Sequence, residues 1–132
     1  MERRLTAILA ADVAGYSRLM GADEVSTLAQ LTTSRALMDR NIAAYRGRIV
    51  NSVGDSVLAE FASAVDAVAA SVAIQREMES ADDRMSTETR VRFRIAVHLG
   101  EVMVRDTDIY GDGVNVAARL QALAGARWNL CV

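Results

Sequence analysis

The sequence predicts an α+β fold with a ferredoxin-like βαββαβ core, an added strand-helix-strand, and helices on one face of an antiparallel or mixed sheet. Three observations carry this prediction. An apolar run ends at Asp12, two short apolar segments flank Gly54-Asp55-Ser56, and residues 91–97 alternate between apolar and polar side chains. These patterns are typical of a buried strand, a hairpin and a strand with one polar face. Helical periodicity between them completes the order strand, helix, strand, strand, helix, strand.

Composition predicts one globular domain over residues 1–132, since 52% of the residues are apolar and 24% are charged. A net charge of -2, with both signs interleaved, offers no broad cationic surface, so we expect no nucleic-acid partner. Cys131 is the only cysteine, which rules out an internal disulfide and favours a reducing compartment such as the cytoplasm. No apolar run approaches the roughly 18 residues of a membrane span, so we expect no membrane segment in this chain.

The first half of the chain contains three predicted strands and two predicted helices. Residues 5–12 form a continuous apolar strand, and residues 23–46 have helical apolar spacing that ends at Gly47. Residues 48–53 and 57–61 form the hairpin strands. A second helix follows Ser63, and the polar residues 79–89 form a loop.

The second half begins with the alternating strand 91–97 and continues, after Gly100, with a separate strand over residues 101–105. Its last helix begins near Asp112 or Gly113. On a helical wheel one side of this helix is apolar, while Asn115 and Arg119 lie on the other and point away from the core. The apolar side consists of Val116, Ala117, Leu120, Leu123 and Ala124.

Three segments together resemble the catalytic domain of the class III adenylyl/guanylyl cyclases. They are AADVAGYS at residues 10–17, the Gly54-Asp55 hairpin, and DIYGDGVNVAARL at residues 108–120. The resemblance covers nearly the whole chain, in the family's order. It implies a nucleotide cyclase-like fold and cyclisation of a nucleoside triphosphate, with ATP to 3′,5′-cyclic AMP plus pyrophosphate favoured, for intracellular signalling.

The resemblance also implies two Mg²⁺ or Mn²⁺ ions in the site. The carboxylates of Asp12 and Asp55 and the backbone carbonyl of Val13 correspond to the family's metal ligands. Two hard carboxylates are what a pair of divalent ions needs in order to act on the attacking hydroxyl and on the leaving pyrophosphate. Gly15, Tyr16 and Ser17 resemble the turn whose amide groups hold the triphosphate.

Two residues of the last helix correspond to catalytic groups of the family. By resemblance, Asn115 holds the ribose and Arg119 contacts the α-phosphate. In the family these residues come from the partner subunit, so the resemblance implies a homodimer with shared active sites.

Base recognition departs from the family pattern. Adenylyl cyclases usually have a lysine four residues before the hairpin aspartate, and guanylyl cyclases have glutamate, whereas this chain has Asn51. Asp108 matches the acidic residue that pairs with the adenine amino group. We therefore expect ATP as the favoured substrate, with relaxed selectivity or lower affinity because a neutral amide replaces an ammonium group.

A second departure lies at the carboxyl end. The family's domain continues beyond Val132 through a helix and a hairpin with a triphosphate-binding lysine, so the chain resembles a C-terminally truncated domain. Loss of that lysine is expected to lower turnover.

Other interpretations of the same residues stay open. Asp12 and Asp55 are also common turn residues, and the chain is alternatively a weakly active or inactive regulatory, dimerisation or nucleotide-binding module, or an unrelated ferredoxin-like binding domain. We expect Arg92 and Arg94 to line a dimer surface or to face solvent, and we assign no catalytic role to His98.

Overall fold

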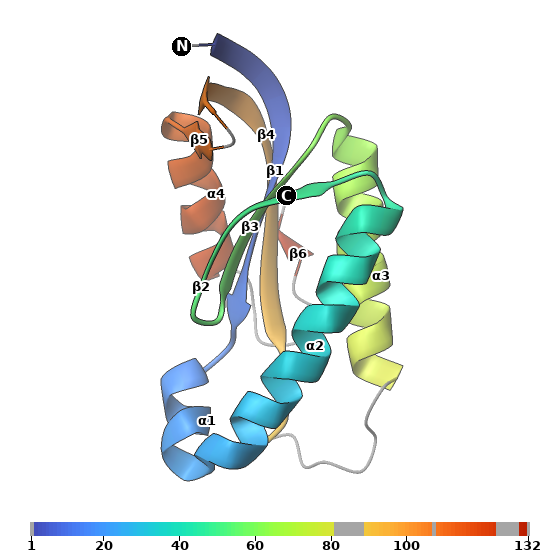
Figure 1. The fold of residues 1–132 in the computed structure, drawn as a ribbon, viewed down its shortest axis with the longest axis vertical. Coiled ribbons are helices and arrows are strands. Elements are labelled where there is room, and N and C mark those ends of the chain that lie inside the picture. The colour runs from blue at the N-terminus through green and yellow to red at the C-terminus, as the bar shows by residue number, and fades with distance from the viewer. Residues whose placement is uncertain (1, 81–88, 107, 124–129, 132) are drawn as a thin grey trace.

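A curled sheet lies between two groups of helices in the computed structural model, which describes residues 2–80, 89–106, 108–123 and 130–131 (Figure 1). The predicted α+β class is confirmed. The elements in chain order are β1 (Glu2–Val13), α1 (Tyr16–Ala22), α2 (Glu24–Ala44), β2 (Arg48–Val53), β3 (Ser56–Phe61), α3 (Ala64–Ser80), β4 (Phe93–Arg105), β5 (Asp108–Tyr110), α4 (Asp112–Leu123) and β6 (Leu130–Cys131).

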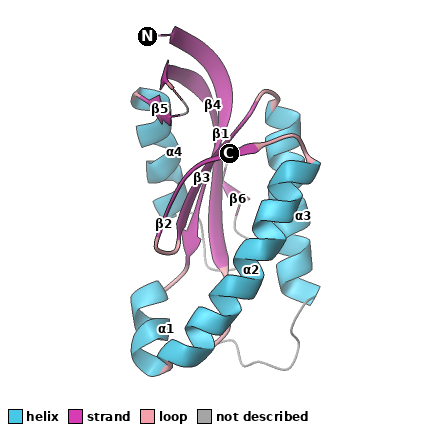
Figure 2. Cartoon of the chain, viewed as in Figure 1, coloured by secondary structure: helices cyan, strands magenta, loops and turns pink. Residues whose placement is uncertain are grey.

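The strands follow the order β2-β3-β1-β4-β5, and β6 pairs with β4 (Figure 2). All pairs along this path are antiparallel, while β6 is parallel to β4. The central position of β1 agrees with its apolar sequence, because a strand with neighbours on both sides and helices on both faces has no polar surface to present.

Helices cover both faces of the sheet. The main core lies on the face covered by α2 and α3 and includes Leu9, Phe61 and Phe93. A smaller core on the opposite face contains Ile8 from β1 and Ala117 from α4. The prediction that all helices share one face is therefore wrong for α4, and the physical reason is that β1 has buried apolar side chains on both of its faces.

Helix α2 begins where the sequence predicts but ends differently. The Asp23 carboxylate accepts a hydrogen bond from the backbone N–H of Ser26 at 3.0 Å and caps the helix. At the other end the left-handed residue is Arg46, with φ 65°, and not Gly47. Gly47 is needed for a different reason, since a Cβ there would lie 2.4 Å from the Phe61 ring.

Strand β4 is one continuous strand of 13 residues, so the prediction of two separate strands around Gly100 is wrong. Glycine here lets α4 lie close to the sheet, because a Cβ on Gly100 would stand 3.3 Å from the Cα of Gly113.

Helix α4 begins at Asp112 as predicted. Its predicted apolar side is wrong at Leu123, which is 78% exposed, and Ala124 lies outside the described residues. Of the predicted loop, residues 79 and 80 still belong to α3, and residues 81–88 lie outside the described part.

Gly113→Ala is expected to destabilise the fold. The added Cβ would lie 2.9 Å from the Glu101 backbone oxygen and 3.1 Å from Ile8 Cδ1, so α4 must move away from the sheet. Such overpacking costs about 1–3 kcal/mol of unfolding free energy, which urea denaturation measures. Gly21→Ala is the control, because Gly21 has no atom within 4 Å of its added Cβ, and this change should stabilise α1 by up to about 1 kcal/mol. Equal effects of the two changes would contradict the close packing of α4.

Candidate active site

Asp12 and Asp55 come together where β1 ends beside the tip of the β2–β3 hairpin. Val53 pairs with Ser56, so Gly54 and Asp55 form a two-residue turn, and Gly54 adopts φ 57°. The Asp55 Oδ2 atom accepts a hydrogen bond from the backbone N–H of Val13 at 3.0 Å. This bond fixes the Asp55 carboxylate against the residue that follows Asp12.

A third charged group, Arg94, lies beside Asp12 and Asp55, and we call the place where these two carboxylates meet the corner. Arg94 is directly opposite Asp12 in the β1–β4 pairing, and its Nε and Nη2 atoms donate to the two Asp12 carboxylate oxygens at 2.9 and 2.8 Å. β4 presents Arg94 on the same face of the sheet as Asp12, with 29% of its side chain exposed, so the predicted solvent contact is only partial and the predicted dimer surface stays a prediction. Arg92, two residues away, has no such contact with either carboxylate among the described interactions.

The electrostatics of the corner follow from this geometry. The side-chain hydrogen bond from Arg94 to Asp12 raises the pKa of the Arg94 guanidinium above its ordinary value, and the charges of Asp12 and Asp55 act in the same direction, while burial opposes them. The charges of both carboxylates therefore act on the Arg94 guanidinium. The exposed fractions of the Arg94 and Asp12 side chains are 29% and 19%, so solvent still reaches the pair.

The corner offers few but suitable ligands for a divalent cation. Within the described ranges there is no group of three or more His, Cys, Asp and Glu residues arranged for a metal ion. Magnesium commonly uses only one or two carboxylates together with water and substrate phosphates. Asp12 and Asp55 supply two carboxylates at this position. The donor set therefore fits a Mg²⁺ or Mn²⁺ site completed by a phosphate ligand.

The turn after β1 carries the residues predicted to hold a triphosphate. Gly15 precedes α1 with φ 64°, and no side chain donates or accepts a capping hydrogen bond at the start of this helix. The first backbone N–H groups of a helix have no partner within the helix itself. Tyr16 is half-buried and packs against the main core, whereas Ser17 is exposed. The structure places this turn directly after Asp12 and Val13. That Gly15, Tyr16 and Ser17 bind the triphosphate stays a prediction.

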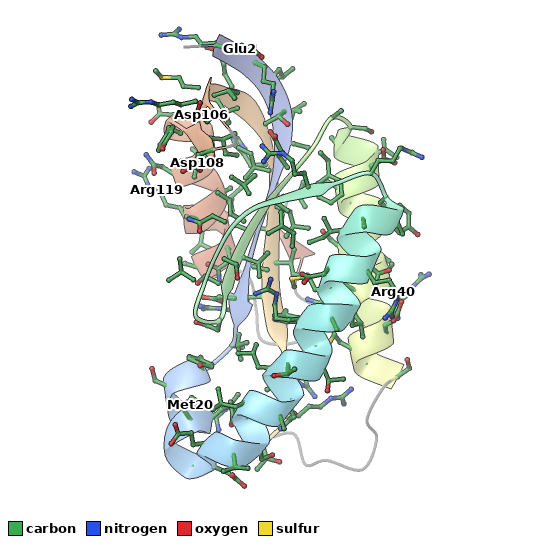
Figure 3. All side chains as sticks on the ribbon, viewed as in Figure 1. Glu2, Met20, Arg40, Asp106, Asp108 and Arg119 are labelled. Carbon is green, nitrogen blue, oxygen red and sulfur yellow. The ribbon has the colours of Figure 1, made fainter. Side chains whose placement is uncertain are left out.

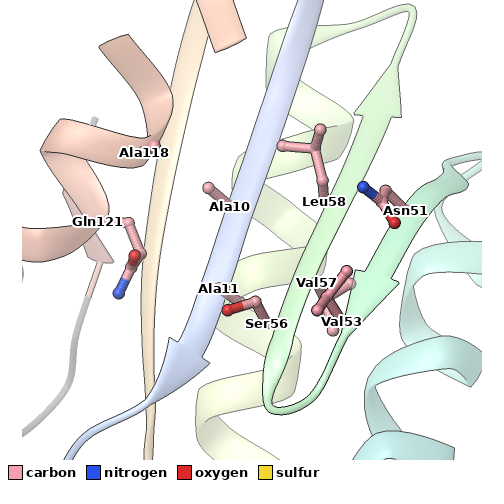
Figure 4. Close-up of a pocket in the computed structure, with 9 residues that line it drawn as sticks. All are labelled: Ala10, Ala11, Asn51, Val53, Ser56, Val57, Leu58, Ala118 and Gln121. Carbon is pink, nitrogen blue, oxygen red and sulfur yellow. The ribbon is translucent and has the colours of Figure 1, made fainter. Parts of the chain in front are cut away.

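A small pocket lies beside the corner, between the sheet and α4 (Figure 4). Its volume is about 160 Å³, less than the roughly 300–1,000 Å³ of most small-molecule sites. The pocket is lined by Ala10, Ala11, Asn51, Val53, Ser56, Val57, Leu58, Ala118 and Gln121.

Two polar groups of this pocket matter for recognition. Asn51 lies on β2, as predicted, and Gln121 lies on α4 across the pocket (Figure 4). Among the described residues, the buried Gln121 Nε2 atom has no hydrogen-bond partner, which marks it as a polar group still to be satisfied. The sequence analysis did not identify Gln121. Its position two residues after Arg119 on the same helix is the only sequence signal, and it is weak.

Asp108 begins the short strand β5. Its Oδ1 atom accepts a hydrogen bond from the backbone N–H of Ile109 at 2.9 Å. A hydrogen bond to Asp108 also raises the pKa of the exposed Tyr110 hydroxyl above its ordinary value. The curl of the sheet brings β5 into contact with β2, the strand of Asn51. The two predicted base-binding residues therefore lie on the two strands that end the strand order, which contact each other.

Asn115 and Arg119 are both exposed on α4. Arg119 points outward from the helix, away from the body of the protein (Figure 3). No hydrogen bond or ion pair joins Asn115 or Arg119 to Asp12 or Asp55 among the described interactions. Within one chain, the two groups of predicted catalytic residues are not brought together.

Comparisons with known proteins agree with this geometry. The family model of the "Adenylate and Guanylate cyclase catalytic domain" matches residues 3–128. A putative adenylate cyclase of Rhizobium meliloti is 46% identical over 94% of this chain, and an adenylate cyclase of Streptomyces coelicolor is 33% identical over 94%. The chain spans only 21% and 31% of the lengths of these two relatives.

Solved structures show the same similarity. An adenylate/guanylate cyclase/hydrolase from Silicibacter pomeroyi has 43% identity and a TM-score of 0.87, covering 94% of this chain and 73% of that protein. A bacterial light-regulated adenylyl cyclase has 25% identity and a TM-score of 0.78, covering 93% of this chain and 41% of that protein. The family match over most of the chain, together with the strand order and the Asp12–Asp55 corner, shows that the chain belongs to the adenylate and guanylate cyclase catalytic-domain family.

Proposed function

We propose that this chain is the catalytic domain of a metal-dependent nucleotidyl cyclase that converts ATP to 3′,5′-cyclic AMP and pyrophosphate. The observation that supports it most is the approach of Asp55 to the backbone beside Asp12, which gathers two carboxylates at one corner of the sheet. The names of the curated relatives support adenylate cyclase activity. Cyclic AMP production in the cytoplasm for signalling is the corresponding biological role.

Each residue group has a defined task in this proposal. Asp12, Asp55 and the carbonyl of Val13 would hold two Mg²⁺ or Mn²⁺ ions. Bound ions of this kind lower the pKa of the ribose 3′ hydroxyl and neutralise the charge that develops on the leaving pyrophosphate. Gly15, with the amides that follow it, would bind the triphosphate and orient the α-phosphate for in-line attack.

The remaining tasks fall to a second copy of the chain. Arg119 would stabilise the charge that spreads over the α-phosphate oxygens, and Asn115 would hold the ribose near its attack position. Since Arg119 points outward from α4 and Asn115 is exposed on the same helix, a homodimer in which α4 of one chain completes the corner of the other satisfies the proposal. None of the described helices is long and apolar enough to cross a bilayer.

The proposal is tested by incubating the protein with ATP or GTP and Mn²⁺ and separating the products by chromatography. Cyclic AMP as the main product supports the proposal. Formation of cyclic GMP from GTP, with no cyclic AMP from ATP, contradicts the choice of base. Nucleotide binding without product supports the second candidate, a cyclase-like regulatory module. That candidate is favoured by Asn51 in place of lysine and by the Arg94 guanidinium on Asp12.

Asn51→Lys is expected to increase the preference for ATP. The Asn51 amide has both donor and acceptor atoms and accepts either purine, whereas an ammonium group only donates and pairs with the acceptor N1 of adenine rather than with the N1–H of guanine. A charge-assisted bond in place of a neutral one should raise kcat/KM for ATP relative to GTP by about tenfold.

Asn51→Met is the matched control, because methionine extends about as far as the lysine stem without its charge. It should give no gain for ATP. A gain with methionine equal to that with lysine would show that side-chain length, and not charge, decides the preference.

A further inference from the structure

Arg94 binds Asp12 in the geometry of a cation that belongs to the site. Its Nε and Nη2 atoms each contact one carboxylate oxygen, at 2.9 and 2.8 Å, which is the parallel two-bond arrangement that arginine forms with carboxylates. The contact is part of the β1–β4 register, since the two residues are directly opposite each other. The strand pairing therefore places the guanidinium beside the carboxylate.

The second carboxylate lies close to this pair, because Asp55 is held at the residue that follows Asp12. Asp55 is tied to the Val13 backbone N–H at 3.0 Å, and its charge acts on Arg94. Two carboxylates gathered at one corner repel each other unless a positive charge lies near both. Arg94 supplies that charge within the chain.

A divalent ion cannot simply be added to this arrangement. It would bring two positive charges into contact with carboxylate oxygens that already accept bonds from a guanidinium, and like charges at such short range repel strongly. Mg²⁺ also demands near-ideal octahedral geometry. The Arg94 side chain is 29% exposed, so it has solvent into which to withdraw.

We propose that Arg94 is a tethered counter-ion of the Asp12–Asp55 pair, which offsets part of the negative charge of the two carboxylates in the metal-free protein and must leave Asp12 before a divalent ion binds. Arg94 thereby sets the affinity for the ion. It is a positioning residue that acts through Asp12. This inference rests on the proposed function, because it assumes that Asp12 and Asp55 bind the ion.

The role predicts opposite effects in the presence and absence of metal. Arg94→Gln removes the competing charge, so Mn²⁺ should bind about tenfold more tightly than to the unchanged protein. The same change leaves the carboxylate pair without a counter-ion, so the metal-free variant should melt at a lower temperature and gain more from added Mn²⁺. A structural salt bridge alone predicts the lower melting temperature but not the tighter binding.

The experiment is a Mn²⁺ titration without nucleotide, in which electron paramagnetic resonance measures the free ion and a thermal melt is recorded in parallel. Arg92→Gln is the matched control, because it removes the same charge from the same segment two residues away and should bind Mn²⁺ like the unchanged protein. Arg94→Lys keeps the charge but loses the two-bond fork, and it should fall between the unchanged protein and Arg94→Gln. It also serves as the test variant if Arg94→Gln does not fold.

The outcomes separate this inference from the function on which it rests. Tighter binding by Arg94→Gln, with Arg92→Gln unchanged, supports the counter-ion role. Equal or weaker binding by Arg94→Gln, with binding lost in Asp12→Asn, overturns the counter-ion role and leaves the metal site intact. Absence of Mn²⁺ binding in all variants overturns the metal site and the counter-ion role together.

Discussion

Asp12→Asn and Asp55→Asn are each expected to lower cyclic-nucleotide formation by about a hundredfold or more. Each change keeps the size of the side chain and removes one of the two negative charges at the corner. A neutral amide is a poor ligand for Mg²⁺ or Mn²⁺, and the reaction depends on charge stabilisation at both the attacking and the leaving oxygen. Product formation at saturating ATP and Mn²⁺ measures the effect.

The two variants should differ in stability, which separates chemistry from folding. Asn at position 55 keeps an oxygen that can accept the Val13 N–H bond, so Asp55→Asn should unfold at nearly the same urea concentration as the unchanged protein. Asp12→Asn loses the charge opposite Arg94, at a cost of about 1 kcal/mol for a partly exposed pair.

Asp39→Asn supplies the matched control for activity. Asp39 lies on α2, over the opposite face of the sheet from the corner, and pairs with Arg35 at 3.3 Å. The same chemical change there should leave product formation unchanged. If Asp55→Asn retains full activity, the corner is not the metal site and the proposed mechanism is wrong.

The corner itself was predictable from local sequence. Asp12 ends a continuous apolar run, and Gly54 marks the tight turn that puts Asp55 at a hairpin tip, so both carboxylates are placed by short-range patterns. Their approach follows once β1 pairs with β3, which the hairpin between the helices favours.

Arg94 was not predictable in this way. Alternation over residues 91–97 shows that Arg94 and His98 share the polar face, but not which strand lies beside them. The contact joins residues 82 positions apart in sequence and depends on the β1–β4 register. A shift of the register by one residue would put Asp12 opposite a buried apolar side chain instead.

The position of α4 was missed for a related reason. An amphipathic helix must cover an apolar surface, but its periodicity does not say which face of the sheet that surface is on. The signal lay in β1, where Ile8 and Leu9 are both fully buried although they point to opposite faces. A strand of that kind needs a helix on each side.

Mixing Asp12→Asn with Arg119→Ala is expected to restore activity that neither variant has alone. Under the proposed arrangement each active site takes Asp12 and Asp55 from one chain and Asn115 and Arg119 from the other. Each variant homodimer therefore has two defective sites. In a mixed dimer both defects fall in one site, and the second site has all of its groups intact.

The size of the recovery follows from random pairing. With equal amounts of the two variants, about half of the dimers are mixed, and each mixed dimer has one intact site of its two. Activity should therefore reach about a quarter of that of the unchanged protein. The variants are co-expressed or exchanged under mild denaturant, and product formation is compared with each variant alone.

A second mixture serves as the control. Asp12→Asn with Asp55→Asn should show no recovery. Both carboxylates of a site come from one chain, so each site of the mixed dimer has one defective carboxylate. Recovery in the first mixture and not in the second is the result that a shared site requires. Since Arg119 points outward from α4 and has no described contact with Asp12 or Asp55 in its own chain, a failure of the first mixture despite proven subunit exchange would mean that Arg119 does not act on the partner's corner.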